Sequence, residues 1–133
     1  MSVVAAIINL YIKAHDKKRG GDMLARENRI VSAEDFRHTL RKGKKAGTGN
    51  FLVHVARTED EVTRVGFLVT KVVGKAHDRN LVRRRAQVVS QEKVNKFPKG
   101  FNIVIRALPG AEALSWDEVH AQLDSGIERA IRK

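Results

Sequence analysis

Apolar and polar positions along the chain predict a helix as the first firm element, over Ala33–Lys42. Ser32 is a typical N-cap residue, and Gly43 is a typical stop after the last turn. Val31 and Phe36 occupy the two positions of a hydrophobic staple, in which a residue before the cap packs against one in the second turn. The ordered part of the chain is therefore expected to open with this helix.

Strands are predicted where apolar residues recur with a period of two, over 51–56 and 65–70. The polar stretch 57–63 joins these segments, so we expect them to pair as an antiparallel hairpin. Residues 71–74 add either a short further strand or a bend. A third alternating segment covers 101–106.

A long second helix is expected from Asp78, as its cap, to about Asn95, with Pro98 and Gly100 ending it. At about 100° per residue, one side is apolar, with Leu81, Val82, Ala86, Val88 and Val89. The opposite side carries Asn80, Arg83, Arg84, Gln87 and Gln91. Arg85 falls inside the apolar arc, so its stem should follow the core while its charge reaches water.

The last helix has the clearest start, because Ser115 and Glu118 form a capping box and Val119 completes a staple. Its predicted buried stripe is Val119, Leu123, Ile127, Ala130 and Ile131. Gly126 lowers the intrinsic stability of this helix and indicates close packing. The element order is α-β-β-(β)-α-β-α, which predicts an α+β fold, a two-layer α/β sandwich.

Residues 1–22 are interpreted as an N-terminal extension to a domain of residues 23–133. The apolar run Val3–Ile12 is too short to span a bilayer, and its positive charges follow it, unlike those of a secretory signal. Gly20 and Gly21 then form a flexible junction. Two alternatives stay open: that this run covers an apolar patch, or that it mediates dimerisation.

The formal net charge is +11, and it is unevenly distributed. Residues 108–133 sum to −2, so the first 107 residues hold +13. Six cations against one acid lie between Lys71 and Arg85. Such a local excess favours nucleic acid as the partner. The chain has no cysteine, which excludes a disulfide scaffold and suits a cytoplasmic protein.

Self-sufficient catalysis finds little support in the sequence. Gly74-Lys75 lacks the spacing of a phosphate-binding P-loop, so no nucleotide cofactor is expected. The five histidines show no metal-ligand spacing, so we expect no metal site. A protein-only nuclease built on His54, His77 and Asp78 is the enzymatic alternative.

The start of the second helix is instead suited to RNA. Cations and helix N–H groups there can neutralise phosphates, and Asn80 can bond a sugar or a base. The arginines can also make bidentate phosphate contacts. The predicted RNA-binding residues are Lys71, Lys75, Arg79, Asn80, Arg83 and Arg84.

These residues carry a resemblance to a known family. The segments Arg64-Val65-Gly66-Phe67, Val69-Thr70-Lys71, Val73-Gly74-Lys75-Ala76 and Arg79-Asn80 with Arg83-Arg84 resemble the motif of the bacterial ribonuclease P protein subunit. Arg26-Glu27-Asn28-Arg29-Ile30 is similar to the N-terminal segment of that family. The resemblance covers residues 23–131. Four positions, Leu40, His54, Val72 and Leu81, depart from the usual family pattern.

The resemblance implies the protein subunit of a tRNA-maturing ribonucleoprotein. Its RNA subunit would cleave precursor tRNA with Mg²⁺, which the RNA and the substrate mainly hold. The protein would bind the RNA subunit, and hold the 5′ leader of precursor tRNA in a cleft between the sheet and the first helix. The cleft residues implied are Phe36, Leu40, Phe51 and His54. A left-handed βαβ crossover is also implied, against the general rule.

A ribosomal protein or RNA chaperone is the alternative within the binding class. It would share the charge and the fold class but would not act on precursor tRNA. No membrane partner is expected for either interpretation.

Overall fold

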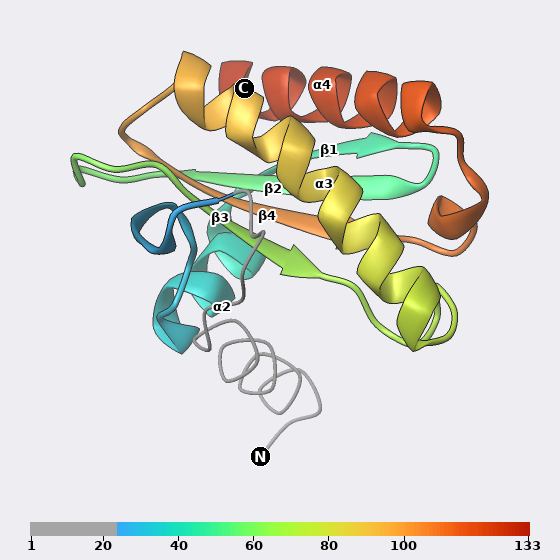
Figure 1. Cartoon of the computed structure of the whole chain (residues 1–133). Helices are drawn as coiled ribbons and strands as arrows, with labels where there is room; N and C mark the ends of the chain where they lie inside the picture. Colours follow the sequence, from blue (N-terminus) through green and yellow to red (C-terminus); the bar gives the residue numbers. More distant parts are fainter. Residues whose placement is uncertain (1–23) are drawn as a thin grey trace.

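The computed structural model describes residues 24–133, so the predicted extension of residues 1–22 lies outside the described part. A four-stranded sheet carries two long helices on one side and a short helix on the other (Figure 1). The elements in order are η1 (Arg26–Asn28), α2 (Ala33–Lys42), β1 (Lys44–Thr48), β2 (Phe51–Arg57), β3 (Arg64–Leu68), α3 (Ala76–Lys96), β4 (Phe101–Ala107), η2 (Ala111–Ala113) and α4 (Trp116–Arg132). The predicted α+β class and helix–strand order are confirmed.

The sheet order is β1-β2-β4-β3, which contradicts the predicted hairpin between residues 51–56 and 65–70. β4 lies between these two strands, antiparallel to β2 and parallel to β3. β2 forms its hairpin with β1 instead. The sequence pattern misses β1 because Ala46 is its one buried residue. Residues 71–74 form a turn, and the β3-α3-β4 connection is the implied βαβ unit, whose hand stays a prediction.

Helix ends follow the predicted capping, with one shift. The Ser32 hydroxyl accepts a hydrogen bond from the Asp35 N–H, and Ser115 and Glu118 form the expected capping box of α4. α3 begins earlier than predicted, and Lys75 is its N-cap. The carboxylate of Asp78 reaches back to accept from the Lys75 N–H at 3.2 Å, so Asp78 is the third residue of the helix rather than its cap.

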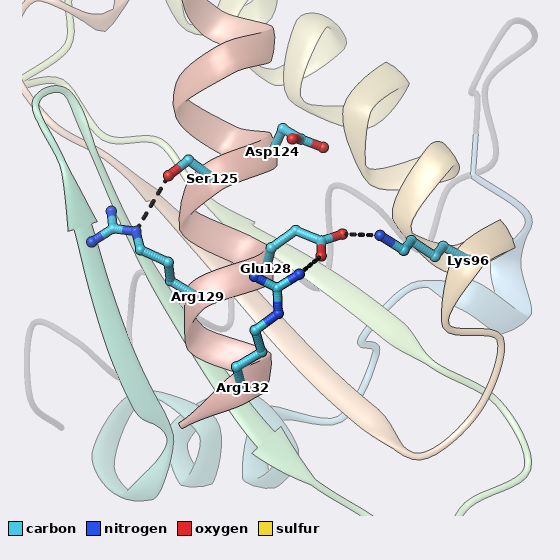
Figure 2. Close-up of a pocket in the computed structure, with 6 residues that line it drawn as sticks. All are labelled: Lys96, Asp124, Ser125, Glu128, Arg129 and Arg132. Atoms are coloured by element: carbon cyan, nitrogen blue, oxygen red, sulfur yellow. Dashed lines mark hydrogen bonds and ion pairs between the residues drawn. The ribbon is translucent and has the colours of Figure 1, made fainter.

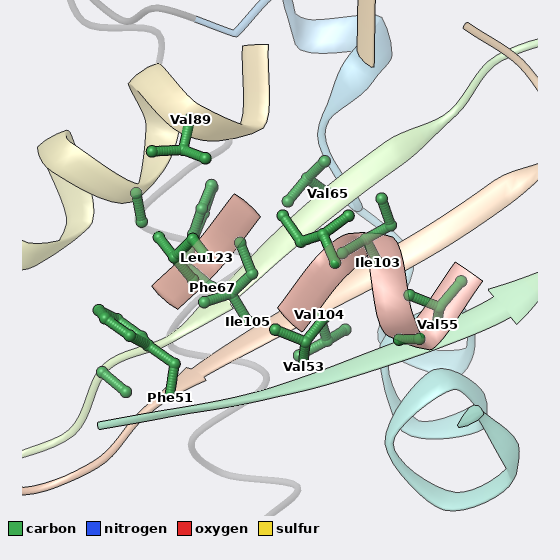
Figure 3. Packing of buried hydrophobic residues seen from close by; sticks show 14 of the residues in the cluster. Phe51, Val53, Val55, Val65, Phe67, Val89, Ile103, Val104, Ile105 and Leu123 are labelled. Carbon is green, nitrogen blue, oxygen red and sulfur yellow. The ribbon is translucent and has the colours of Figure 1, made fainter. Parts of the chain in front are cut away.

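Glycines mark where helices approach the sheet most closely. A Cβ at Gly126 of α4 would lie 3.0 Å from Cγ2 of Val53, which confirms the predicted close packing. A Cβ at Gly66 would lie 2.8 Å from Cε2 of Phe36, so Gly66 faces α2 on the opposite side. Since side chains alternate along a strand, these two contacts assign every strand residue to a face. Figure 3 shows the core on the α4 side, which includes Phe51, Phe67 and Leu123.

The buried surface of α3 is wider than predicted because α4 packs beside it as well as the sheet below it. Gln87 was expected on the polar side but is buried. Arg85 does not reach water freely, since its Nη1 donates to the Leu114 carbonyl at 2.7 Å. The predicted stripe of α4 is buried in full.

A network of charged groups joins the last turns of α3 and α4 (Figure 2). Glu128 Oε2 accepts from Lys93 Nζ at 2.7 Å and from Lys96 Nζ at 2.8 Å, and Arg132 reaches Oε1 at 3.0 Å. The hydrogen bonds from Lys93 and Lys96 lower the pKa of Glu128 to about 2. Burial alone would lower the pKa of Lys93, but hydrogen bonds to Asp124 and Glu128 raise it. Both groups are therefore charged at neutral pH.

Replacing Glu128 with glutamine is expected to lower the free energy of unfolding by about 2 kcal/mol at neutral pH, because the buried Lys93 loses a charged partner. The contribution of Glu128 is complete above the ordinary carboxyl pKa of 4.5 and is lost as the pH falls toward about 2, so the difference between the two proteins should shrink over that window. Denaturant unfolding at several pH values measures it. Glu34→Gln is the control, because that carboxylate pairs with Arg37 at an exposed site. A pH-independent difference would contradict the assignment.

Candidate nucleic-acid interface

The predicted RNA-binding residues lie together around the start of α3, and we call Lys71, Lys75, Arg79, Asn80, Arg83 and Arg84 the α3 basic surface. The turn that leads into it is held in place. Val73 is buried, and its N–H donates to the Thr70 carbonyl at 3.0 Å. Gly74 has a φ of 148°, and a Cβ there would meet the Asp78 carboxylate at 2.7 Å, so this position requires glycine.

The cations of the α3 basic surface divide into two kinds. Lys71, Lys75 and Arg84 are exposed and make no ion pair with any residue from 24 to 133. Arg79 is half-buried, and its Nη1 donates to the Gly74 carbonyl at 2.9 Å, which braces the turn. Arg83 Nη1 donates to Asn80 Oδ1 at 2.8 Å. The first three cations are therefore open to solvent, whereas Arg79 and Arg83 also order the surface.

The four residues of the implied leader cleft do not lie together on one exposed surface. Phe36 is fully buried, with its ring edge against Gly66, so it offers no exposed face to a base. Phe51 is also fully buried, and it lies on the α4 side of the sheet, as its place two residues before Val53 requires. Both residues are thus part of the core. Leu40 is half-buried beside that core.

His54 does lie on the sheet face toward α2, but it is 4% exposed. Burial first, and the charges of Lys45 and Arg106 next, lower its pKa, so the imidazole is neutral at pH 7. Neither ring nitrogen has a hydrogen-bond partner among the described residues. His54 is therefore a neutral group close to two cations, Lys45 and Arg106.

An open row crosses the α2 side of the sheet next to His54. It consists of Gly47, Leu52, Arg106 and Leu68, which are paired in register across all four strands. Gly47 and Arg106 are exposed, and the two leucines are half-buried. Sequence reasoning missed this row as a site, although the alternation over 51–56 already placed Leu52 on the face of His54. Apolar side chains with a cation suit unpaired nucleotides.

The elements of the nuclease alternative are not assembled. His77 is exposed in the first turn of α3 and lies 3.2 Å from the Asp78 carboxylate, whereas His54 is buried in the middle of β2. No hydrogen bond joins His54 to the other two. Residues 24–133 also contain no cluster of three potential metal-ligating His, Cys, Asp or Glu side chains. Over the same range, no helix is long and apolar enough to cross a bilayer.

An α+β domain with a basic helix start beside an open sheet face is typical of a nucleic-acid-binding protein. Comparison with known proteins makes the class specific. The sequence model of the family described as Ribonuclease P matches residues 24–131. The ribonuclease P protein component of Clavibacter michiganensis is 44% identical over 111 residues, covering 83% of this chain and 98% of that protein. The protein component of an Arthrobacter species is 40% identical over 84% of this chain and 82% of its own.

Solved structures agree on the fold. The ribonuclease P protein of Staphylococcus aureus aligns with a TM-score of 0.68 at 24% identity, over 77% of this chain and 94% of that one. The protein of Thermotoga maritima aligns with a TM-score of 0.67 over 79% and 99% of the two chains. This chain belongs to the ribonuclease P protein family. It is a protein component of the tRNA-processing ribonuclease, and the ribosomal and chaperone interpretations are set aside.

Proposed function

We propose that this protein binds the RNA subunit of ribonuclease P through the α3 basic surface and the 5′ leader of precursor tRNA along the open row of the sheet. Catalysis then resides in the RNA subunit, and the protein alone is inactive. One observation carries the proposal: Lys71, Lys75 and Arg84 gather on a braced helix start without competing carboxylates as partners within the described part of the chain. Neutralising phosphates there relieves the repulsion between a catalytic RNA and an RNA substrate.

The open row explains how the leader would be held. Leu52 and Leu68 offer apolar area to unstacked bases, and Arg106 between them faces the backbone phosphates. α2 covers the next row, where Phe36 lies over Gly66, and so forms one wall. Leu40 contributes to this wall, and His54 lies at the floor beside it.

In this proposal the RNA, rather than the protein, binds the magnesium ions. The described residues do not fit a Mg²⁺ site, because they supply no convergent carboxylates. The ion would be held by phosphates of the RNA subunit and of the precursor. The protein contributes positive charge and position, which raise the affinity for a polyanionic substrate without acting on the scissile bond.

Cleavage of labelled precursor tRNA tests the proposal directly. The protein alone should leave the precursor intact, and a bacterial ribonuclease P RNA with Mg²⁺ at low salt should cleave it faster when the protein is added. Activity of the protein without RNA would support the nuclease alternative. A lack of stimulation would leave only a general RNA binder.

Arg106→Gln is expected to weaken binding of leader-bearing precursor tRNA by roughly threefold to tenfold, the share of one phosphate contact, and to leave mature tRNA unaffected. Arg64→Gln is a matched control, since Arg64 lies on the same sheet face but pairs with Asp60 at 2.9 Å. Filter binding of precursor and mature tRNA to the holoenzyme gives the ratio of the two affinities. Equal losses for precursor and mature tRNA would place the leader elsewhere.

A further inference from the structure

A second basic site lies at the end of the molecule away from the α3 basic surface. It is a cavity of about 210 Å³, which we call the far-end cavity. The C-terminal ends of α2 and α4, the start of β1, the end of β2 and the start of β4 enclose it. Its lining includes Lys42, Lys44, Val55, Arg57, Phe101 and Ala130.

The lining holds no carboxylate side chain. Lys42, Lys44 and Arg57 are exposed, and none makes an ion pair within the described part of the chain. Cations at helix C-termini often serve only to offset the helix dipole, which amounts to about half a negative charge per helix. The C-terminal ends of α2 and α4 together therefore carry about one negative charge, whereas these three side chains carry three positive charges. The ammonium of Lys133, which donates to the Lys45 carbonyl, adds a fourth positive side chain to the lining. The excess positive charge is available to a ligand.

The geometry of Arg57 adds specificity to this charge. Its guanidinium lies 5.4 Å from the centroid of the Phe101 ring, and its Nη2 donates to the Ile131 carbonyl at 3.5 Å. The Phe101 ring is itself held edge-on by Phe97, with centroids 5.9 Å apart. A planar guanidinium fixed in this way keeps free N–H groups for a bidentate contact with phosphate. Buried Val55 and Ala130 form an apolar floor, which strengthens charge interactions above it.

The loop that follows β2 carries three acids, none of which lines the cavity. Asp60 pairs with Arg64 at 2.9 Å and Glu61 lies 3.6 Å from Lys99, whereas Glu59 is exposed and makes no ion pair within the described part of the chain. The network of Glu128 lies in the adjacent site between α3 and α4, where its oxygens are bound by Lys93, Lys96 and Arg132. The far-end cavity therefore keeps its positive potential.

The two basic sites are too far apart to act as one. α3 has 21 residues and lies along the sheet between them (Figure 1), which amounts to about 30 Å at 1.5 Å per residue. The screening length is about 8 Å at physiological ionic strength, so charges at one site do not act on the other. A polyanion that occupies both sites must present phosphates about 30 Å apart.

We propose that the far-end cavity binds backbone phosphate of a second RNA segment, so that the protein bridges two segments of its RNA partner. Its volume is below the ~300–1,000 Å³ of pockets that enclose a whole small ligand, and it suits a group projecting from a larger chain. The inference rests on the proposed function in one respect, because that function makes RNA the polyanion at hand.

An NMR titration of the isotope-labelled protein with a single-stranded RNA hexanucleotide tests this inference. Saturable shifts are expected in two separate groups of amides, one around residues 71–84 and one around Lys44, Val55 and Arg57. The variant Lys42→Gln/Lys44→Gln should lose about tenfold in affinity at the second group, the share of two phosphate contacts near 0.15 M salt, and nothing at the first. Arg37→Gln/Lys99→Gln removes the same charge from acid-paired positions outside the cavity and should change neither.

Shifts confined to residues 71–84 would overturn this inference and leave the proposed function intact, whereas their absence in both groups would count against the proposed function as well. An equal loss of affinity in the control variant would show that the effect comes from the net charge of the protein rather than from the cavity. A parallel titration with inorganic pyrophosphate separates a small-anion site from an RNA site. Saturation of the cavity amides by pyrophosphate, without a response to the hexanucleotide, would also overturn the proposal.

Discussion

Replacing Lys71, Lys75 and Arg84 together with glutamine is expected to weaken binding to the ribonuclease P RNA subunit about a hundredfold near 0.15 M salt. Each phosphate contact contributes about 0.7 to 0.9 to the slope of log affinity against log salt, so the triple variant should also lose about two to three units of that slope. These three side chains are exposed and free of ion pairs with other described residues, so their removal should leave the thermal midpoint nearly unchanged.

The matched control removes three cations that already have acidic partners: Arg37, Arg64 and Lys99. Its net charge falls by the same amount, but its salt slope should match that of the unchanged protein. Arg79→Gln offers a contrast, since Arg79 braces the Gly74 carbonyl and its loss should disturb the turn as well as the affinity. If salt titrations gave the same slope for the triple variant and the control, RNA affinity would depend only on the net charge of the protein and not on these three positions.

Gly66→Ala is expected to lower the free energy of unfolding by about 2 kcal/mol, because the new methyl group overpacks the contact between the sheet and α2. Its Cβ would lie 2.8 Å from Cε2 of Phe36 and 3.4 Å from Cδ1 of Ile30. Both of these side chains are fully buried, so neither can move aside into solvent. Denaturant unfolding with an unchanged m-value measures the loss.

Gly47→Ala is the matched control within the same sheet. The nearest atom to a Cβ at Gly47 is Cδ1 of Leu52, at 3.9 Å, so this change should be nearly neutral. Combining Gly66→Ala with Phe36→Leu, which shortens the side chain at the contact, should recover about 1 kcal/mol relative to additive effects. Strict additivity of the two changes would show that the Phe36 ring is not what requires glycine at position 66.

Local structure was readable from the chain wherever short-range physics decides it. The caps at Ser32 and Ser115 and the apolar stripe of α4 are predicted by the sequence, because each depends on residues within a few turns of one helix. A glycine within that helix also indicates close packing at Gly126, although its contact, Val53, lies in β2. The cluster of cations at the start of α3 was predicted for the same reason. It is a contiguous feature, so no knowledge of the sheet was needed to find it.

Strand pairing and the faces of the sheet were decided by the tertiary structure alone. β4 enters between β2 and β3, which no pattern within residues 51–70 records, because pairing depends on a partner more than thirty residues away. The same non-local packing turned Phe36 and Phe51 into core and left Arg106 open to solvent. The far-end cavity likewise joins Lys44, Arg57 and Phe101 from three strands. A linear pattern determines which residues share an element, but the side that is buried depends on what packs against it.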